Sequence, residues 1–299
     1  MTSSNVTTPS EPVPAPAPPT VTGVNESTPH RIGVAVPDVD RAVEFFASIV
    51  GDSPVRAAAD LVRTVAFAPN TDVTLIPVAP DAAFGSPPRV VDVGTNHLCF
   101  RVGDIDVAAA YLAEQPGVRV LGDIVTVPDG PIRGNRWIYF RSPWGTLFEL
   151  QQWPKHPAYQ ADTSARLFHG QSPADDARLP SLLGLDHTGY SVRDLEATIR
   201  YLVDRHGATE VLRTRIDAGR DFMSAQFGID VEGTSTMAML VVDDALNIEL
   251  FEHSVGAQDP PRPPRAPGGN VLALHAQDCA PESAVETEFG IVVGTEFGR

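Results

Sequence analysis

The sequence predicts an α+β protein built from tandem βαβββ modules, three complete and a fourth incomplete, whose curved mixed sheets surround a cup. Three observations predict this fold. One pattern recurs along the chain, each copy starts with a strand, an aspartate and an amphipathic helix, and the complete copies end in paired strands. The chain has 299 residues, 42% of them hydrophobic, and is therefore long enough to bury a substantial core.

The start of each module is a short apolar strand followed by a helix. The three copies of this start span residues 31–46, 97–112 and 187–202. Directly after each strand stands an aspartate that is well placed to cap the helix, because a short carboxylate accepts hydrogen bonds from the free N–H groups of a first turn. These aspartates are Asp38, Asp104 and Asp194.

The end of each complete module is a pair of strands joined by a short turn. We expect these pairs at 64–68 and 73–76, at 137–141 and 147–151, and at 236–242 and 247–251. A fourth unit starts at Asn270 and continues through a weaker helical stretch to Glu296, which leaves it without closing strands. Something must then cover its open edge.

The predicted domain limits follow these units. Residues 1–28 are rich in Pro, Ser, Thr and Ala and have neither the basic start nor the apolar stretch of a signal peptide, which predicts a disordered tail. Residues 29–153 are expected to form one domain with units one and two. Residues 154–183 form a linker, and residues 184–299 form a second domain with unit three and the partial unit four.

Charge and cysteine content restrict the partners and the compartment. The formal net charge is −16, and no run of Lys or Arg is long enough to bind a row of phosphate groups. Neither nucleic acid nor a membrane is therefore an expected partner. No apolar run is long enough to cross a bilayer, and the two cysteines are far apart. We expect a cytoplasmic protein, monomeric or homodimeric, that binds a small molecule.

Alternation along the strands predicts a metal site in the cup. Side chains of a strand point alternately to its two faces, so the apolar set of each module packs on its helix and the polar set faces the cup. Units two and three each place one His and one Glu on that face, and these residues are His97, Glu149, His187 and Glu249. Two imidazoles and two carboxylates suit a divalent ion such as Zn, Mn, Ni, Co or Fe(II).

Any one of these four residues alone is more often an ordinary strand histidine or a surface glutamate; their equivalent positions in two repeats indicate the site. Unit one has Arg31 and Thr74 at the corresponding positions, and unit four has Val271, so we expect both to be metal-free. Two pairings of the units remain open. Pairing in order would give each cup one His and one Glu, whereas pairing unit two with unit three collects all four in one cup, and the ligand pattern favours the latter.

The stretch from Gly134 to Leu150, with Glu149 between Phe and Leu, resembles glyoxalase-type modules of the vicinal oxygen chelate superfamily, and Glu249 between Ile and Leu repeats the pattern. This superfamily includes glyoxalase I, methylmalonyl-CoA epimerase, extradiol dioxygenases, and bleomycin- and fosfomycin-resistance proteins. The resemblance covers about residues 29 to 290 and implies a glyoxalase-like fold. One scaffold of this kind supports many reactions.

The resemblance implies a substrate with adjacent oxygens that chelates the metal, and a carboxylate, Glu149 or Glu249, that moves a proton beside the substrate carbonyl. An epimerase or isomerase, such as one acting on a cyclitol ketone, or a glyoxalase-like lyase would work in this way. Candidate substrate contacts are Arg101, Arg136, Tyr139 and Gln151.

Two alternatives stay open. An extradiol ring-cleaving dioxygenase ranks lower, because a fourth protein ligand would occupy a position that dioxygen needs. A metal-free protein that binds a small molecule, such as an antibiotic, would use the cup as an apolar pocket, with Trp137, Trp144 and Trp153 as candidate lining residues. No nucleophile-elbow or phosphate-loop motif points elsewhere.

Overall fold

The computed structural model of the chain describes residues 29–57, 62–67, 71–82, 85–170, 172–274 and 285–294. The tail predicted at residues 1–28 lies outside this part of the chain. Among the described residues, no helix is long and apolar enough to cross a membrane.

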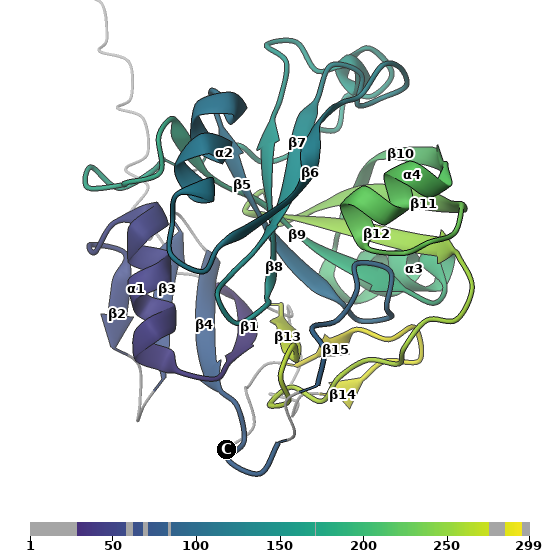
Figure 1. Ribbon diagram of the computed structural model, residues 1–299. Helices are drawn as coiled ribbons and strands as arrows, with labels where there is room; N and C mark the ends of the chain where they lie inside the picture. The colour runs from purple at the N-terminus through teal and green to yellow at the C-terminus, as the bar shows by residue number, and fades with distance from the viewer. Residues whose placement is uncertain are drawn as a thin grey trace, which may run out of the picture.

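The strands of the described part of the chain form two sheets (Figure 1). The first has the order β14 (Val285–Glu286), β15 (Val292–Val293), β13 (Asn270–Ala273), β1 (His30–Val36), β4 (Thr71–Pro77), β3 (Arg63–Phe67), β2 (Val55–Ala57). The second has the order β10 (Thr209–Ala218), β11 (Gly233–Val242), β12 (Leu246–Ser254), β9 (Leu182–Val192), β5 (Asn96–Val102), β8 (Leu147–Gln152), β7 (Arg136–Arg141), β6 (Arg119–Thr126). The predicted α+β class and the βαβββ modules are confirmed.

Three helices begin where the sequence predicts: α1 (Val39–Val50), α2 (Ile105–Ala113) and α3 (Leu195–His206). Each predicted aspartate caps its helix: Asp38 accepts from the amide of Arg41 at 3.0 Å, Asp104 from that of Asp106 at 3.1 Å, and Asp194 from that of Ala197 at 2.8 Å. Three short helical segments were not predicted: η1 (Ala158–Ala161), α4 (Arg220–Phe222) and the π-helical η2 (Met223–Phe227).

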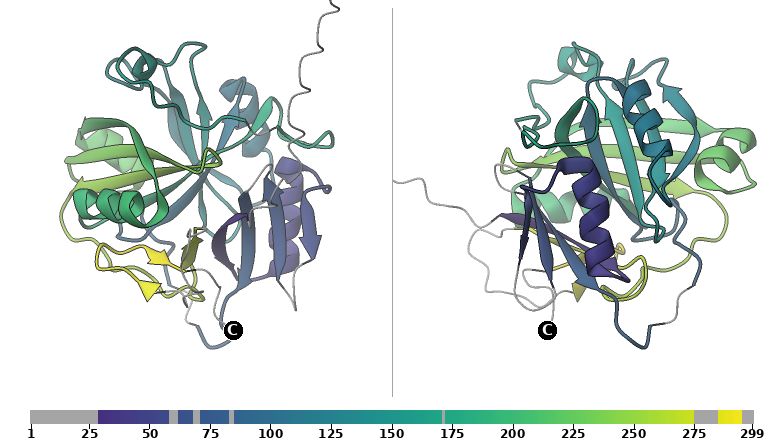
Figure 2. Two further views of the ribbon diagram at one scale, coloured as in Figure 1. Left: turned by 180° about the vertical axis from the view of Figure 1, so that it is seen from behind. Right: turned by 60° about the vertical axis from the view of Figure 1, so that its left-hand side comes forward.

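The two sheets show which units pair. At the centre of the second sheet β5 runs antiparallel to β9, which joins unit two to unit three. In the first sheet β1 runs antiparallel to β13, which joins unit one to unit four. Both views in Figure 2 keep the first and last units together on one side of the molecule. This is the pairing that the ligand pattern favoured.

The register of the strands makes the repeat positions comparable. Glu149 lies opposite Cys99, two residues beyond His97, and Glu249 lies opposite Gly189, two residues beyond His187. In unit one Thr74 lies opposite Gly33, two residues beyond Arg31. The positions read from the sequence as equivalent are therefore equivalent in the sheets, and unit one lacks the His and the Glu.

The end of unit four differs from the sequence expectation. Residues 275–284 lie outside the described residues, but β14 and β15 form an antiparallel pair where a helical stretch was expected to continue. The helical prediction is wrong there because Gly290, with a φ of 96°, and the hydroxyl of Thr287, which accepts from the amide of Ile291 at 3.2 Å, build a turn. The β-branched run after the turn then favours a strand.

The segment predicted as a linker packs against the second sheet. Its side chains Tyr159 and Leu167 are buried in a cluster with Met237, Met239 and Phe251. Each sheet contains one unit that precedes this segment in the sequence and one unit that follows it. The domain limits at 153 and 184 stay a prediction.

Phe148 connects unit one to unit two. It is fully buried, and its ring lies 5.1 to 6.0 Å from the rings of Phe45 and Phe46 on α1 and of Phe100 and Phe140 in the sheet. We predict that Phe148→Ala lowers the free energy of unfolding by about 3–5 kcal/mol, because the lost ring leaves a cavity that these neighbours cannot close.

Denaturant unfolding measures this loss, and Val107→Ala, on the exposed face of α2, is the matched control with an expected change within about 0.5 kcal/mol. Equal losses in the two variants would contradict the packing role of Phe148.

Candidate metal centre

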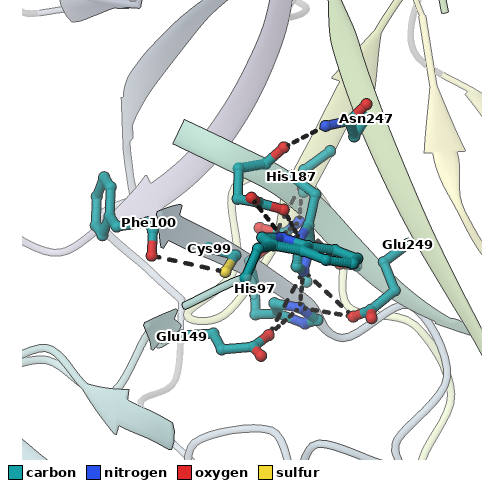
Figure 3. A network of polar contacts seen from close by, with 12 residues as sticks. His97, Cys99, Phe100, Glu149, His187, Asn247 and Glu249 are labelled. Atoms are coloured by element: carbon teal, nitrogen blue, oxygen red, sulfur yellow. Dashed lines mark hydrogen bonds and ion pairs between the residues drawn. The ribbon is translucent and has the colours of Figure 1, made fainter. Parts of the chain in front are cut away.

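Four neighbouring strands bring the predicted ligands together. His97 on β5, Glu149 on β8, His187 on β9 and Glu249 on β12 each offer one donor atom, and these atoms lie within 4.8 Å of one another. The Nε2 atoms of the two histidines are 3.2 Å apart, and Oε2 of each glutamate lies 3.2 Å from Nε2 of His97. Figure 3 shows the four side chains pointing to one place.

The four residues are buried, each with an exposed fraction of 4% or less. Within the described residues, Oε2 of each glutamate has only the two imidazole Nε2 atoms as polar neighbours, at 3.2 to 3.5 Å, and these nitrogens can donate to it only when they are protonated. Burying carboxylate oxygens without donors is unfavourable, and a cation among them would remove that cost. This donor set, two nitrogens and two orphaned carboxylate oxygens, therefore fits a divalent ion.

The electrostatics of the cluster are strongly coupled. Burial lowers the pKa of His97, but hydrogen bonding to Glu149 and Glu249 outweighs it, so the pKa lies above its usual value. Burial raises the pKa of Glu249, yet the charge of His187 and bonds to both imidazoles bring it down to about 2. Where no ion binds, the imidazoles hold protons against the carboxylates, and an ion would replace those protons.

Asp186 orients His187, a role that strand alternation did not predict. Its Oδ1 lies 2.9 Å from Nδ1 of His187, while Oδ2 accepts from the indole of Trp153 at 3.0 Å and lies 3.4 Å from Nε2 of His169. A carboxylate on Nδ1 leaves the Nε2 lone pair free to bind a metal. Alternation would send Asp186 to the opposite face from His187, but the pairing of β5 with β9 skips this residue, and that bulge turns it to the same side.

Gly189 makes room for His97. The two residues are opposite each other on β9 and β5, and a Cβ atom at Gly189 would lie 1.9 Å from Cε1 of His97. No side chain fits there unless the imidazole moves. In the sequence this glycine stands two residues after His187. Its role cannot be inferred until the partner strand, which carries His97, is known.

A pocket with a cavity volume of about 40 Å³ opens beside the cluster. Both glutamates line it, together with two of the predicted substrate contacts, Tyr139 and Gln151. The remaining lining residues, mostly apolar, are Ile132, Trp137, Ile216, Ala218, Phe222, Phe227, Ser235, Met237 and Phe251. No pattern in the sequence pointed to Ser235 or to the η2 segment that contributes Phe227.

The structure places the other two predicted substrate contacts away from this pocket. Arg136 forms an ion pair with Asp106 of α2 at 2.6 Å, on the outer side of the sheet. Arg101 lies on the same strand as His97, and its guanidinium donates to the carbonyl of His169 at 2.9 Å. Neither lines the pocket. Cys99 is buried beside His187 and Asp186, and burial raises the pKa of its thiol.

Comparison with known proteins identifies the class. A family profile described as the Glyoxalase/Bleomycin resistance protein/Dioxygenase superfamily matches residues 30–134. A 2-epi-5-epi-valiolone epimerase from an Actinomyces species is 38% identical over 168 residues, which are 50% of this chain and 92% of that protein. The chain belongs to this superfamily, as the resemblance indicated, and an epimerase is among its relatives.

Two solved structures are more distant. A variant of glyoxalase I from Zea mays is 15% identical and matches 83% of this chain and 76% of its own, with a TM-score of 0.47. A glyoxalase/bleomycin resistance protein/dioxygenase from Nocardioides is 16% identical and matches 51% of this chain and 92% of its own, with a TM-score of 0.32.

We predict that Gly189→Ala displaces the imidazole of His97, because the added methyl group occupies its position. The displacement is measured as a shift of the His97 imidazole signals in ¹⁵N-edited NMR and as movement of the ring in a crystal structure. Gly256→Ala is the matched control, since its Cβ would meet no atom within 4 Å. An unmoved His97 ring in Gly189→Ala would contradict the close approach.

Proposed function

We propose that the protein is a metal-dependent epimerase that moves a proton next to the carbonyl of a hydroxylated cyclic ketone. One observation carries the proposal: two buried carboxylates, one from each paired module, line the same pocket and meet the same two imidazoles. The relative from Actinomyces supports the reaction class and supplies the first substrate to test, 2-epi-5-epi-valiolone.

In this proposal His97, Glu149, His187 and Glu249 hold the ion, whose identity stays open among Zn, Mn, Ni, Co and Fe(II). A divalent ion, when bound, polarises the substrate carbonyl and stabilises the negative charge that develops on its oxygen. Asp186 keeps Nδ1 of His187 engaged so that Nε2 faces the ion. The backbone of Gly189 sets how closely His97 can approach.

The carboxylates perform the proton transfer. Glu149 comes from unit two and Glu249 from unit three, so they approach a ligand in the pocket from two different strands. The ionised glutamate removes the proton from one side of the substrate carbon, and the other glutamate, in its protonated form, returns a proton to the opposite side, which inverts the configuration and exchanges the protonation states of the two glutamates. Tyr139 and Gln151 contact the substrate. Arg101 and Arg136 take no part in this proposal, because neither lines the pocket.

The alternatives fit these features less well. Four protein ligands leave less room for the dioxygen and diol of a ring-cleaving oxygenase. A metal-free binding pocket gives no reason to bury two orphaned carboxylates. Of the three tryptophans suggested for such a pocket, Trp137 lines it, whereas Trp144 packs on Phe45 and Trp153 donates to Asp186. A glyoxalase-like lyase would use the same proton transfer.

We predict that the purified protein contains about one divalent ion per chain, and that His187→Ala and Glu149→Gln lower this content because each removes a ligand atom. Asp186→Asn should weaken metal affinity by about 10- to 100-fold, since the neutral amide orients His187 less strongly. Elemental analysis and competition with a chelator measure these changes. The controls are the exposed His156→Ala and Glu114→Gln. Unchanged metal content in both ligand variants would refute the shared site.

We predict that the protein catalyses exchange of one proton of 2-epi-5-epi-valiolone with solvent, measured by NMR in D₂O. Glu149→Gln and Glu249→Gln should each lower turnover by at least about 100-fold, at metal concentrations that saturate each variant. Each variant should lose exchange from one epimer and keep it from the other, because the carboxylates serve opposite faces. Loss from the same epimer in both variants would refute two bases, and no exchange by the wild type would refute the reaction.

A further inference from the structure

The module-three wall of the pocket contains one neutral polar side chain, Ser235, among the lining residues that the structure describes. Apart from it and Glu249, this wall is apolar, with Ile216, Phe227 and Phe251 among its residues. Ser235 is 4% exposed, and its hydroxyl lies 2.7 Å from Nδ1 of His253, its cross-strand partner. Neither residue has a part in the proposed proton transfer.

The hydroxyl of Ser235 belongs to a chain of hydrogen bonds that ends at a backbone carbonyl. His253 Nε2 lies 3.0 Å from the hydroxyl of Ser191, and that hydroxyl lies 2.5 Å from the carbonyl oxygen of Val90. A carbonyl oxygen can only accept, so Ser191 must donate its single proton to Val90. The donor and acceptor of the last hydrogen bond in this series are therefore fixed.

The positions of the remaining hydrogens follow from this donation by Ser191 to Val90. Because Ser191 has no second proton, it accepts from His253, and Nε2 of His253 must carry a hydrogen. A neutral imidazole has only one N–H, so Nδ1 accepts and the hydroxyl of Ser235 donates to it. Burial lowers the pKa of His253 to about 4, in agreement with a neutral ring. The ring is held in place by stacking on Phe251 at 5.3 Å.

We infer that Ser235 is held as a hydrogen-bond acceptor toward the pocket, where it recognises a hydroxyl of the substrate. The hydroxyl of Ser235 donates its only proton to His253. Its oxygen can therefore accept a hydrogen bond from a ligand in the pocket but cannot donate one. A hydroxylated ring satisfies this wall, whereas a ring that presents an ether or carbonyl oxygen there does not. His253 and Ser191 are positioning residues, because they act through Ser235. The substrate class rests on the proposed function; the polarity of Ser235 does not.

The tautomer of His253 tests the polarity without any substrate. We expect ¹⁵N NMR of the full-length, Zn²⁺-loaded protein with labelled histidines to show Nε2 protonated and Nδ1 unprotonated at pH 7. The His253 signals are those that shift in both Ser191→Ala and Ser235→Ala. In Ser191→Ala the proton should move to Nδ1, since only Ser235 is left to accept it. A proton on Nδ1 in the wild type, or on both nitrogens, overturns the inference whether or not the variants fold.

Kinetics with 2-epi-5-epi-valiolone test the recognition. Ser235→Ala should raise KM about three- to tenfold with little change in kcat, because the lost hydrogen bond is made equally in the ground and transition states. Ser235→Thr keeps the hydroxyl and should restore KM. Ser191→Ala, which reverses the polarity, should raise KM although Ser191 does not line the pocket beside the cluster. Thr236→Ala, the neighbouring position on the other face of β11, is the control.

A wild-type KM in Ser235→Ala overturns the recognition, as does a wild-type KM in Ser191→Ala once its tautomer has changed. If the wild type neither turns over nor exchanges this ketone, the proposed function fails, and the tautomer measurement still determines the polarity of Ser235.

Discussion

The antiparallel pairing of β5 with β9 is the contact on which the site depends. It places His97 opposite Gly189 and His187 opposite Cys99, and thereby brings two imidazoles from distant parts of the chain within 3.2 Å. The parallel neighbours β8 and β12 then bring one glutamate each to the same point. A different partner for either central strand would leave one His and one Glu in each of two cups.

That pairing is stabilised by apolar packing rather than by the polar cluster. On three of the four strands a fully buried apolar residue stands next to the predicted ligand: Leu98 after His97, Phe148 before Glu149 and Leu250 after Glu249. The cluster itself opposes folding, because it removes two carboxylates and two imidazoles from water and gathers them in one place. The hydrophobic cores on the helix sides of the strands offset this cost. In metal-binding proteins a cost of this kind is commonly offset when the ion binds.

Much of the organisation could be predicted because it is local or repeated. Helix caps depend on a side chain and amides two or three residues away, and all three predicted caps were found. Strand alternation fixed the face of each ligand, and repetition fixed the equivalent positions, including Arg31 and Thr74 in the unit without ligands. The end of unit four was mispredicted because a weak apolar pattern at 285–293 suits a helix or a strand equally, and the Thr287 turn selects the strands.

The sequence by itself determined the modules, their helix caps and the four residues of the cluster, because period-two and helical patterns are properties of neighbouring residues. Only the tertiary structure determined that units two and three share a sheet, since strand pairing joins residues 90 positions apart. Only the structure placed Asp186 behind His187, because a bulge breaks the alternation from which faces are predicted. The same holds for Arg136, whose side chain has an ion-pair partner on α2, and for Ser235, whose polarity is fixed by the carbonyl of Val90 through two other side chains.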